Sequence, residues 1–252
     1  MGLAAARDRL AQARALVVGA GGLGSPVAYY LAAAGVGRIG LADGDTVDLT
    51  NLHRQILHTT ADLGRYKVTS GAEKLRRLNP AVQVAEHREH LNAANALALL
   101  ADYDVIIDGS DNFPTRYLLN DACVLLRKPL VHGAIYRFDG QVSCFVPGRG
   151  PCYRCLFPAP PPAGTQLSCA EVGVFGVLPG FVGAVMAAEA VKLLSGTGEP
   201  LIGRLLLYNS LDLAVHSVRL RRDPNCPACG DQPSLTGLID YAQSCDLRAA
   251  GR

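Results

Sequence analysis

The sequence predicts an α/β fold with a doubly wound, mostly parallel sheet and an antiparallel extension. Residues Ala15–Val18 and Arg38–Ala42 are short apolar runs, which are typical of strands buried on both faces of a parallel sheet. Further along, Leu130–Tyr136 and Gln141–Val146 are joined around Asp139-Gly140, a pattern that favours an antiparallel pair. We therefore expect a doubly wound half that ends near residue 128 and a mixed half after it.

A glycine loop follows the first of these strands. Gly19, Gly21 and Gly24 stand in G-x-G-x-x-G register, and helical spacing begins directly after them. Glycines let the backbone approach a phosphate closely, and a helix N-terminus presents unpaired N–H groups to an anion. Asp43 ends the second strand, about 20 residues beyond the last glycine, where dinucleotide folds place the acid that binds ribose. We therefore predict a Rossmann-like nucleotide site. The alternative, a glycine-rich turn in a plain α/β domain, is less favoured, and this stretch does not identify the nucleotide.

The remaining segments complete one predicted domain over residues 1–252. Helices are expected at residues 1–14, 25–34, 67–78, 92–100 and 114–127, and strands at 82–86, 104–108, 204–209 and 214–220. Gly44–Tyr66 has no sustained period and is unusually polar for a loop in a compact domain, which suggests a functional role. Pro158–Ala163 can only be a loop. We divide the domain into a nucleotide-binding half, 1–128, and a mixed half, 129–252.

Composition narrows the classes of partner. The chain of 252 residues is 49% hydrophobic and carries a net charge of +2 without a basic run, so we expect no nucleic-acid partner. No secretory signal opens the sequence, which makes export an unfavoured interpretation and a cytoplasmic location the expected one. Val172–Leu194 is long enough to span a bilayer. Pro179 and several glycines instead predict a loop followed by a buried helix of about 16 residues, without a membrane.

Two cysteine pairs form the clearest metal-binding pattern. Cys152 and Cys155 make one C-x-x-C pair, and Cys226 and Cys229 make another. Four thiolates complete a closed tetrahedral zinc shell, so we predict a structural zinc knuckle that joins two distant parts of the chain. Two independent redox pairs, or a chance pattern, are the alternatives; neither pair opens a helix after a strand as a thioredoxin-type motif should.

A second group of residues suggests a polyphosphate ligand. Arg54, Lys67, Asp111 and Asn112 come from separate segments near the glycine loop. A hydride-transfer site has no evident use for two cations and an additional carboxylate. A triphosphate with magnesium does, because cations neutralise the phosphate oxygens and a carboxylate binds the metal. The alternative is a solvated polar surface.

The other candidate side chains are single residues. Cys169 lies in the segment LSCAEVGVFG after the proline-rich loop, where a thiol is either a nucleophile or inert. Cys123, Cys144 and Cys245 are expected to be small apolar core residues. His53 and His132 fall near the predicted site, and structural roles are favoured for both.

The motifs in their order resemble the MoeB/ThiF/HesA adenylyltransferases, which resemble the ubiquitin-activating enzymes. The resemblance covers about Leu16–Gly230. It rests on GAGGLGSP, LADGDTVDLTNLHRQ, the G-x-x-K of Gly64–Lys67, Asn79-Pro80, DGSDNFPTR and both cysteine pairs. It implies a cytoplasmic, homodimeric enzyme that uses ATP and Mg²⁺ and contains Zn²⁺. Such an enzyme adenylates the C-terminal glycine of a small ubiquitin-like sulfur-carrier protein ending in Gly-Gly and releases pyrophosphate, in molybdopterin, thiamine, thiolated-tRNA or cysteine synthesis.

The resemblance also implies residue roles. For the nucleotide, it places Gly22, with Gly19, Gly21 and Gly24, on the phosphates and Asp43 on the ribose. Thr50, Asn51 and Arg54 would line the ATP pocket, and Lys67 would bind the phosphates together with Arg54.

For the metals, it places Asp111 on magnesium with Asn112 beside it, and the four paired cysteines on zinc. Cys169 would be the crossover-loop thiol, which in some members bonds covalently to the carrier.

One family feature is missing before the first strand. Family members usually begin with an Arg-Tyr-x-Arg-Gln segment, whose arginine reaches the ATP of the partner subunit. The present sequence offers Arg7, Arg9 and Arg14 instead. Because the resemblance includes no rhodanese domain, we expect sulfur to come from another protein.

Three other functions remain open at this point. A nicotinamide-dependent dehydrogenase would use the same glycine loop but would give no joint role to Arg54, Lys67 and Asp111. An inactive dimeric scaffold would bind ATP and carrier without forming an acyl-adenylate. The same family has a dehydratase branch that acts on small molecules or tRNA. The two cysteine pairs make membership of that branch less favoured than membership of the adenylyltransferases.

Overall fold

One eight-stranded sheet runs through the computed structural model, which describes residues 3–161 and 173–241. Its strands are β1 (Arg14–Val18), β2 (Arg38–Ala42), β3 (Gln83–His87), β4 (Val105–Asp108), β5 (Leu130–Tyr136), β6 (Asp139–Phe145), β7 (Arg204–Asn209) and β8 (Val215–Arg219). They lie in the order β3-β2-β1-β4-β5-β6-β7-β8. Neighbours from β3 to β5 are parallel, and neighbours from β5 to β8 are antiparallel. The predicted fold class is confirmed.

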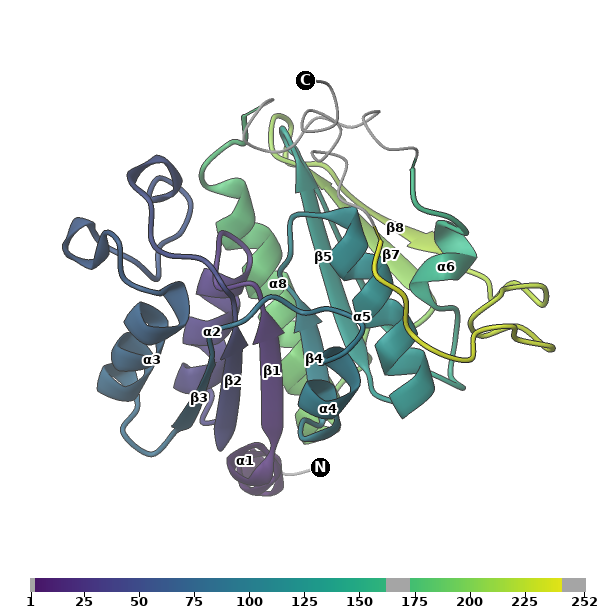
Figure 1. Ribbon diagram of the computed structural model, residues 1–252, viewed down its shortest axis with the longest axis horizontal. Coiled ribbons are helices and arrows are strands. Elements are labelled where there is room, and N and C mark those ends of the chain that lie inside the picture. Colours follow the sequence, from purple (N-terminus) through teal and green to yellow (C-terminus); the bar gives the residue numbers. More distant parts are fainter. Residues whose placement is uncertain (1–2, 162–172, 242–252) are drawn as a thin grey trace.

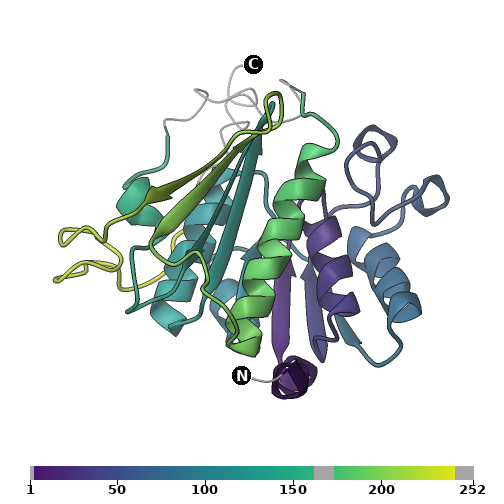
Figure 2. The ribbon, with the colours of Figure 1, turned by 180° about the vertical axis from the view of Figure 1, so that it is seen from behind.

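Helices cover both faces of the sheet. They are α1 (Leu3–Gln12), α2 (Gly24–Ala33), α3 (Lys67–Leu78), α4 (Ala96–Ala101), α5 (Phe113–Leu126), α6 (Tyr153–Leu156) and α8 (Leu178–Ser195), with single 3-10 turns η1 (Leu49–Asn51) and η2 (Thr60–Asp62). Figure 1 shows α4, α5 and α6 in front of the sheet. In the opposite view, α2, α3 and α8 cover the other face (Figure 2).

The core lies in two layers, one on each side of the central strands. In β1, Ala15 and Val17 belong to the core cluster that includes α2 and α8. Leu16 and Val18 belong to the cluster on the α5 side. Because successive side chains of a strand point to opposite faces, both faces of β1 are buried, as the continuous apolar run predicted.

Several predicted elements agree with the structure at both ends, namely the strands Arg38–Ala42 and Arg204–Asn209 and the helix Lys67–Leu78. The helix ends there because Pro80 disfavours helical geometry in the residue before it. β5 pairs antiparallel with β6 as predicted, but it also pairs in parallel with β4. The assignment of this strand to an antiparallel pair alone is therefore wrong, because α5 returns the chain to the amino end of the sheet before β5 begins and β5 then lies parallel to β4.

The long apolar helix α8 is packed inside the protein. The helix is long and apolar enough to cross a membrane, yet half of its 18 residues are buried inside the protein. It contacts α2 and the strands β5 and β6, and Gly196, with a φ of 68°, ends it. Its charged residues Glu189 and Lys192 form an ion pair. The predicted buried helix is confirmed and begins at Leu178, with Pro179 in its first turn, where a proline is tolerated.

Strand order locates the place for a ligand. β2 and β3 lie on one side of β1, while β4 and β5 lie on the other. In such sheets ligands bind outside the carboxyl ends of the strands where the order reverses. Here that point lies between β1 and β4, which the glycine loop and the Asp108–Asn112 segment directly follow.

Candidate active site and metal centre

The glycine loop between β1 and α2 leaves no room for side chains at two positions. Gly19 has a φ of 88°, and a Cβ atom there would lie 2.8 Å from the carbonyl oxygen of Gly109. A Cβ atom at Gly24 would lie 1.8 Å from the carbonyl oxygen of Gly19. The loop therefore packs tightly against the segment after β4. Both segments border the crevice at the point where the strand order reverses.

The tip of the same loop carries backbone donors for an anion. Among the described residues, no hydrogen-bond acceptor is found for the N–H groups of Gly21 and Gly22. A Cβ atom at Gly22 would lie 3.3 Å from Cβ of Pro179 and 3.6 Å from Cγ of Arg54. Unpaired N–H groups at the start of a helix bind phosphate well, and the Arg54 side chain lies directly beside them.

Asp43 is both a candidate ribose ligand and a support for the loop. Its Oδ2 accepts a hydrogen bond from the backbone N–H of Ala20 at 2.8 Å, and its Oδ1 accepts one from Asp45 at 2.8 Å. Burial raises the pKa of Asp43, and the nearby Lys67 ammonium opposes that shift. Each carboxylate oxygen retains accepting capacity after these bonds, so sugar hydroxyls remain acceptable partners.

Lys67 opens α3 and lies close to Asp43. The residue is 6% exposed, and its Nζ lies 2.8 Å from Oδ2 of Asp45 and 3.9 Å from Oδ2 of Asp43. A buried ammonium needs such compensation. The structure therefore brings together two of the predicted site residues and adds Asp45, which the sequence did not single out.

Arg54 is held by neutral groups rather than by an acid. Its Nη2 donates to Oδ1 of Asn51 at 2.7 Å, while Nδ1 of His53 donates to the carbonyl oxygen of Thr50 at 3.0 Å. In residues 3–161 and 173–241 no carboxylate lies within ion-pair distance of Arg54. Its charge is thus available to an anionic ligand. Thr50 instead donates its backbone N–H and hydroxyl to Asp48.

Asp111 and Asn112 follow β4 at the same edge. Asp111 is exposed, and among the described residues it has no ion-pair partner. A free carboxylate suits Mg²⁺, which keeps several waters and takes one or two protein oxygens. Oδ1 of Asn112 accepts from the Thr115 N–H at 2.9 Å. The amide of Asn112 is therefore the N-cap of α5.

A buried pair shapes the loop that carries Asp111. Oδ1 of Asp108 accepts from the backbone N–H of Ser110 at 3.1 Å, and its Oδ2 lies 2.9 Å from Nδ1 of His132. Burial lowers the pKa of His132, with Asp108 opposing. A neutral His132 that donates to Asp108 has the structural role favoured from the sequence.

Two residues near the glycine loop escaped the list of predicted ligands. Gln55 is 4% exposed and lies beside Gly21, and its Oε1 has no hydrogen-bond partner among the described residues. His58 lies 2.9 Å from the Ala20 carbonyl oxygen through Nε2. Both belong to the polar segment Gly44–Tyr66. Its composition predicted a functional role for the segment but did not assign a role to either residue.

The arginines near the N-terminus lie at the opposite end of the sheet. Arg14 opens β1 and pairs with Asp104 at 2.8 Å, and Arg9 donates to the carbonyl oxygen of Ser195. Arg9 and Asp104 border a hollow of about 290 Å³ at the amino ends of the strands. Neither therefore contributes a cation to the glycine loop of its own subunit. Cys169 lies outside the described residues.

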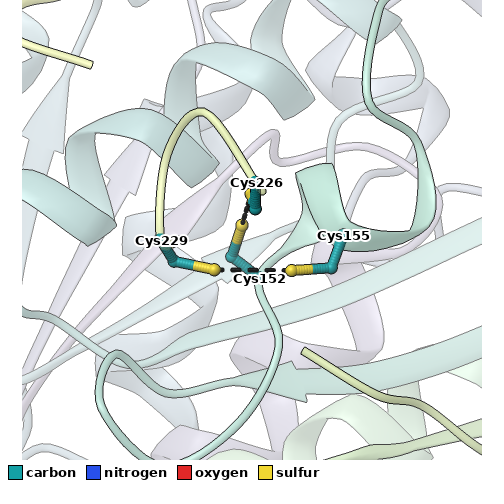
Figure 3. Close-up of side chains that lie close together, drawn as sticks. All are labelled: Cys152, Cys155, Cys226 and Cys229. Atoms are coloured by element: carbon teal, nitrogen blue, oxygen red, sulfur yellow. Dashed lines mark hydrogen bonds between the residues drawn. The ribbon is translucent and has the colours of Figure 1, made fainter. Parts of the chain in front are cut away.

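The two C-x-x-C pairs come together in space (Figure 3). All four Sγ atoms lie within 4.8 Å of one another. Two close contacts join different pairs: Sγ of Cys152 lies 3.5 Å from Sγ of Cys226, and Sγ of Cys155 lies 3.4 Å from Sγ of Cys229. Sulfurs around a tetrahedral zinc are about 3.8 Å apart, so this set fits zinc, whereas two independent redox pairs would not need to meet.

The surroundings of the sulfurs also favour a cation. Burial and the neighbouring thiolates raise the pKa of Cys152, and burial raises the pKa of Cys229 to about 12. For Cys226, burial is outweighed by the backbone N–H groups of Cys229 and Ala228, which lower its pKa. Asp223 donates its N–H to Cys155. A divalent cation would reverse the unfavourable shifts, because a coordinated thiol is deprotonated outright.

Hydrogen bonds tie the knuckle to α5. Arg154, between the first two cysteines, donates to both carboxylate oxygens of Asp121 at 2.7 Å. The backbone N–H of Tyr153 donates to Oδ1 of Asn120 at 2.8 Å. The metal cluster and the helix that follows Asp111 are thus parts of one packed unit.

Comparison with known proteins places this geometry in a family. The ThiF family model matches residues 3–228. The chain is 56% identical over 247 residues to a sulfur carrier protein adenylyltransferase of Thermus thermophilus, covering 96% of this chain and 91% of that protein. It is 50% identical over 245 residues to the adenylyltransferase and sulfurtransferase MOCS3 of Anopheles gambiae, covering 97% of this chain but 56% of that longer protein.

Solved structures agree. E. coli MccB in complex with MccA-N7isoASN has a TM-score of 0.81 at 25% identity, covering 90% of this chain and 70% of that one. MccB with ATP has a TM-score of 0.78 at 26% identity, covering 90% and 69%. With the glycine loop, the paired cysteines and these matches in agreement, the chain belongs to the ThiF family.

Proposed function

We propose that this protein adenylates the C-terminal glycine of a small ubiquitin-like sulfur-carrier protein that ends in Gly-Gly, using ATP and releasing pyrophosphate. The similarity to a sulfur carrier protein adenylyltransferase over nearly the whole chain supports this class of enzyme. One structural observation carries the proposal, namely that Arg54 and Lys67, from separate segments, lie beside the glycine loop and the Asp43 carboxylate. That arrangement suits a triphosphate more than a nicotinamide.

The reaction needs positioning and neutralisation more than covalent chemistry by the protein. A carboxylate oxygen of the carrier attacks the α-phosphorus, the bond to the bridging oxygen breaks, and pyrophosphate leaves. Two anions must approach each other, so cations and oriented dipoles supply most of the catalysis. Arg54 and Lys67 bind the phosphates, the N–H groups of Gly21 and Gly22 bind them from the loop, and Asp43 accepts from the ribose.

The metals have distinct roles. Asp111 would hold Mg²⁺, which supplies charge neutralisation at the leaving pyrophosphate. The four paired cysteines would hold zinc in a closed shell without an open position, which serves structure. We further propose a cytoplasmic homodimer, and a crossover segment with Cys169 as its reactive thiol.

ATP–pyrophosphate exchange tests the proposal. Exchange should require both the protein and a Gly-Gly-ending carrier, and intact-mass spectrometry should show an AMP adduct on that carrier. The matched control is the same carrier without its last two residues. ATP binding without any adduct would favour the inactive scaffold, and tight NADH binding without ATP binding would favour the dehydrogenase.

A further inference from the structure

Both backbone polar atoms of Ala20 are held by side chains. This residue lies between Gly19 and Gly21 and is fully buried. Its N–H donates to Asp43, and its carbonyl oxygen lies 2.9 Å from Nε2 of His58. The N–H belongs to the peptide unit between Gly19 and Ala20. The carbonyl oxygen belongs to the unit between Ala20 and Gly21, which also carries the unpaired N–H of Gly21. Both units are therefore held by side chains.

The protonation of His58 follows from its partners. A carbonyl oxygen only accepts, so Nε2 carries a proton and donates to Ala20. Nδ1 lies 2.9 Å from Oγ of Ser70. Burial lowers the pKa of His58; the Ala20 carbonyl and Asp62 oppose this, while the ammonium groups of Lys74 and Lys67 add to it. The ring is therefore neutral, and Nδ1 accepts from the Ser70 hydroxyl.

The ring joins three parts of the site. His58 belongs to the polar segment that also carries Arg54, and Ser70 lies one turn after Lys67 on α3. Lys74 of the same helix donates to Ser70 at 2.7 Å. Figure 1 shows this segment as loops beside α2 and α3. Fixing the His58 ring thus fixes the glycine loop relative to both cations.

We propose that His58 is a positioning residue for nucleotide binding, because it holds the Ala20 peptide so that the N–H groups of Gly21 and Gly22 stay directed at the phosphates. The inference rests on the proposed use of ATP. Both ring nitrogens are occupied by protein groups, so His58 acts through the loop rather than by touching the nucleotide. Donors fixed before binding lose less entropy when the ligand arrives.

Two amide variants separate positioning from packing. In His58→Gln the side-chain amide nitrogen can occupy the place of Nε2 and donate to Ala20. In His58→Asn the amide reaches only toward Ser70. The experiment measures the Kd of Mg-ATP by calorimetry in the absence of carrier, and then KM for ATP and for the carrier in pyrophosphate exchange.

We expect His58→Asn to raise the Kd for ATP about tenfold, which corresponds to the loss of one hydrogen bond, and to leave KM for the carrier unchanged. His58→Gln should restore most of the affinity. His87→Asn is the matched control, because it removes a histidine that bonds to the Tyr103 hydroxyl instead, and it should leave the Kd for ATP unchanged.

Several results would overturn the inference. If the unmodified protein binds ATP and both variants at position 58 bind it equally well, His58 does not position the loop. Equal weakening by Asn and Gln, in step with their melting temperatures, would show a packing role only. Failure of the unmodified protein to bind ATP would overturn the proposed function and this inference with it. Should His58→Asn fail to fold, Ser70→Ala removes the Nδ1 partner and must weaken ATP binding for the inference to hold.

Discussion

At the scale of single residues, charge compensation organises the site before any ligand arrives. Lys67 is nearly buried and lies between the carboxylates of Asp43 and Asp45, so its charge is stabilised and its position is fixed. Among the described residues, the Arg54 guanidinium hydrogen-bonds only to the amide of Asn51 and the imidazole of His53. The first cation is therefore preorganised by acids, and the second is left to be paired by the ligand.

Replacing Lys67 tests this arrangement. In Lys67→Ala the phosphates lose a cation, and Asp43 and Asp45 are left without compensation. We expect pyrophosphate exchange to fall by about 10²- to 10³-fold, the usual effect of removing one electrostatic contact to the transition state. Lys128→Ala is the control, because within the described part of the chain the Lys128 ammonium hydrogen-bonds to the carbonyl oxygen of Ala101 alone. Unaltered exchange in Lys67→Ala would contradict the assignment of Lys67 to the triphosphate.

Sequence reasoning worked for residues whose role depends on local pattern. Gly19 and Gly24 were recognised because their spacing alone reports a tight turn. Asn112 caps α5, and an Asn two residues before Pro114 is an N-cap pattern that local rules contain. Its place beside the nucleotide stays a prediction. The bond from His58 to Ala20 spans 38 positions, and no local pattern reports it.

At the scale of elements, the four-cysteine cluster and α5 form one unit. Arg154 and Tyr153 of α6 bind Asp121 and Asn120 of α5, while Tyr117 of α5 donates to the carbonyl oxygens of Phe157 and Ala159. The cysteines therefore anchor a helix whose first residues lie at the ligand edge.

Loss of one thiolate should destabilise this unit. We expect Cys226→Ser to lower zinc content from about one ion per chain and to lower the free energy of unfolding by at least about 3 kcal/mol, because structural zinc contributes folding free energy directly. Metal analysis and urea denaturation measure the two effects. Cys123→Ala, at a buried thiol outside the cluster, should keep its zinc. A zinc-free protein of full stability would contradict the metal assignment.

The ends of a helix or strand could be predicted where a single sequence pattern, an apolar run or helical spacing, determines them. β2, α3 and β7 were found with both ends because their apolar runs or helical spacing stop at clear boundaries. β5 is assigned from the sequence to the antiparallel part alone. A buried strand with one parallel and one antiparallel neighbour has the same apolar pattern as a buried strand with two antiparallel neighbours. Only the sheet as a whole distinguishes them.

At the scale of the whole molecule, buried neutral histidines link stability to pH. Burial lowers the pKa of His58 and of His132 below the ordinary value of 6.5. As pH falls below about 6.5, the unfolded chain takes up protons that the folded protein does not. The free energy of unfolding should therefore decrease until the folded-state pKa values are reached.

Urea denaturation between pH 8 and pH 5.5 measures this dependence. The slope should be shallower in His58→Gln, which has no proton to gain at this position. His216→Gln, at an exposed site on β8, should keep the slope of the unmodified protein. Stability that is constant or rises toward pH 5.5 would contradict the assignment of neutral buried rings.

Long-range packing explains what the sequence could not supply. The meeting of the two cysteine pairs was predictable because zinc chemistry demands four ligands, whatever their separation. The contact of Gly22 with Pro179 was not, because apolar and small residues carry no information about their distant partners.

That contact bears on how the protein can be divided. A Cβ atom at Gly183 would lie 2.4 Å from Cγ of Pro26 and 2.7 Å from the carbonyl oxygen of Leu23, so α8 packs closely against the first turn of α2 and forms a wall behind the phosphate loop. An excised fragment of the first 128 residues would keep every nucleotide motif and lose that wall. A transplantable ATP module of this chain must therefore include α8, and it must reach Cys229 if the four-cysteine cluster is to be kept.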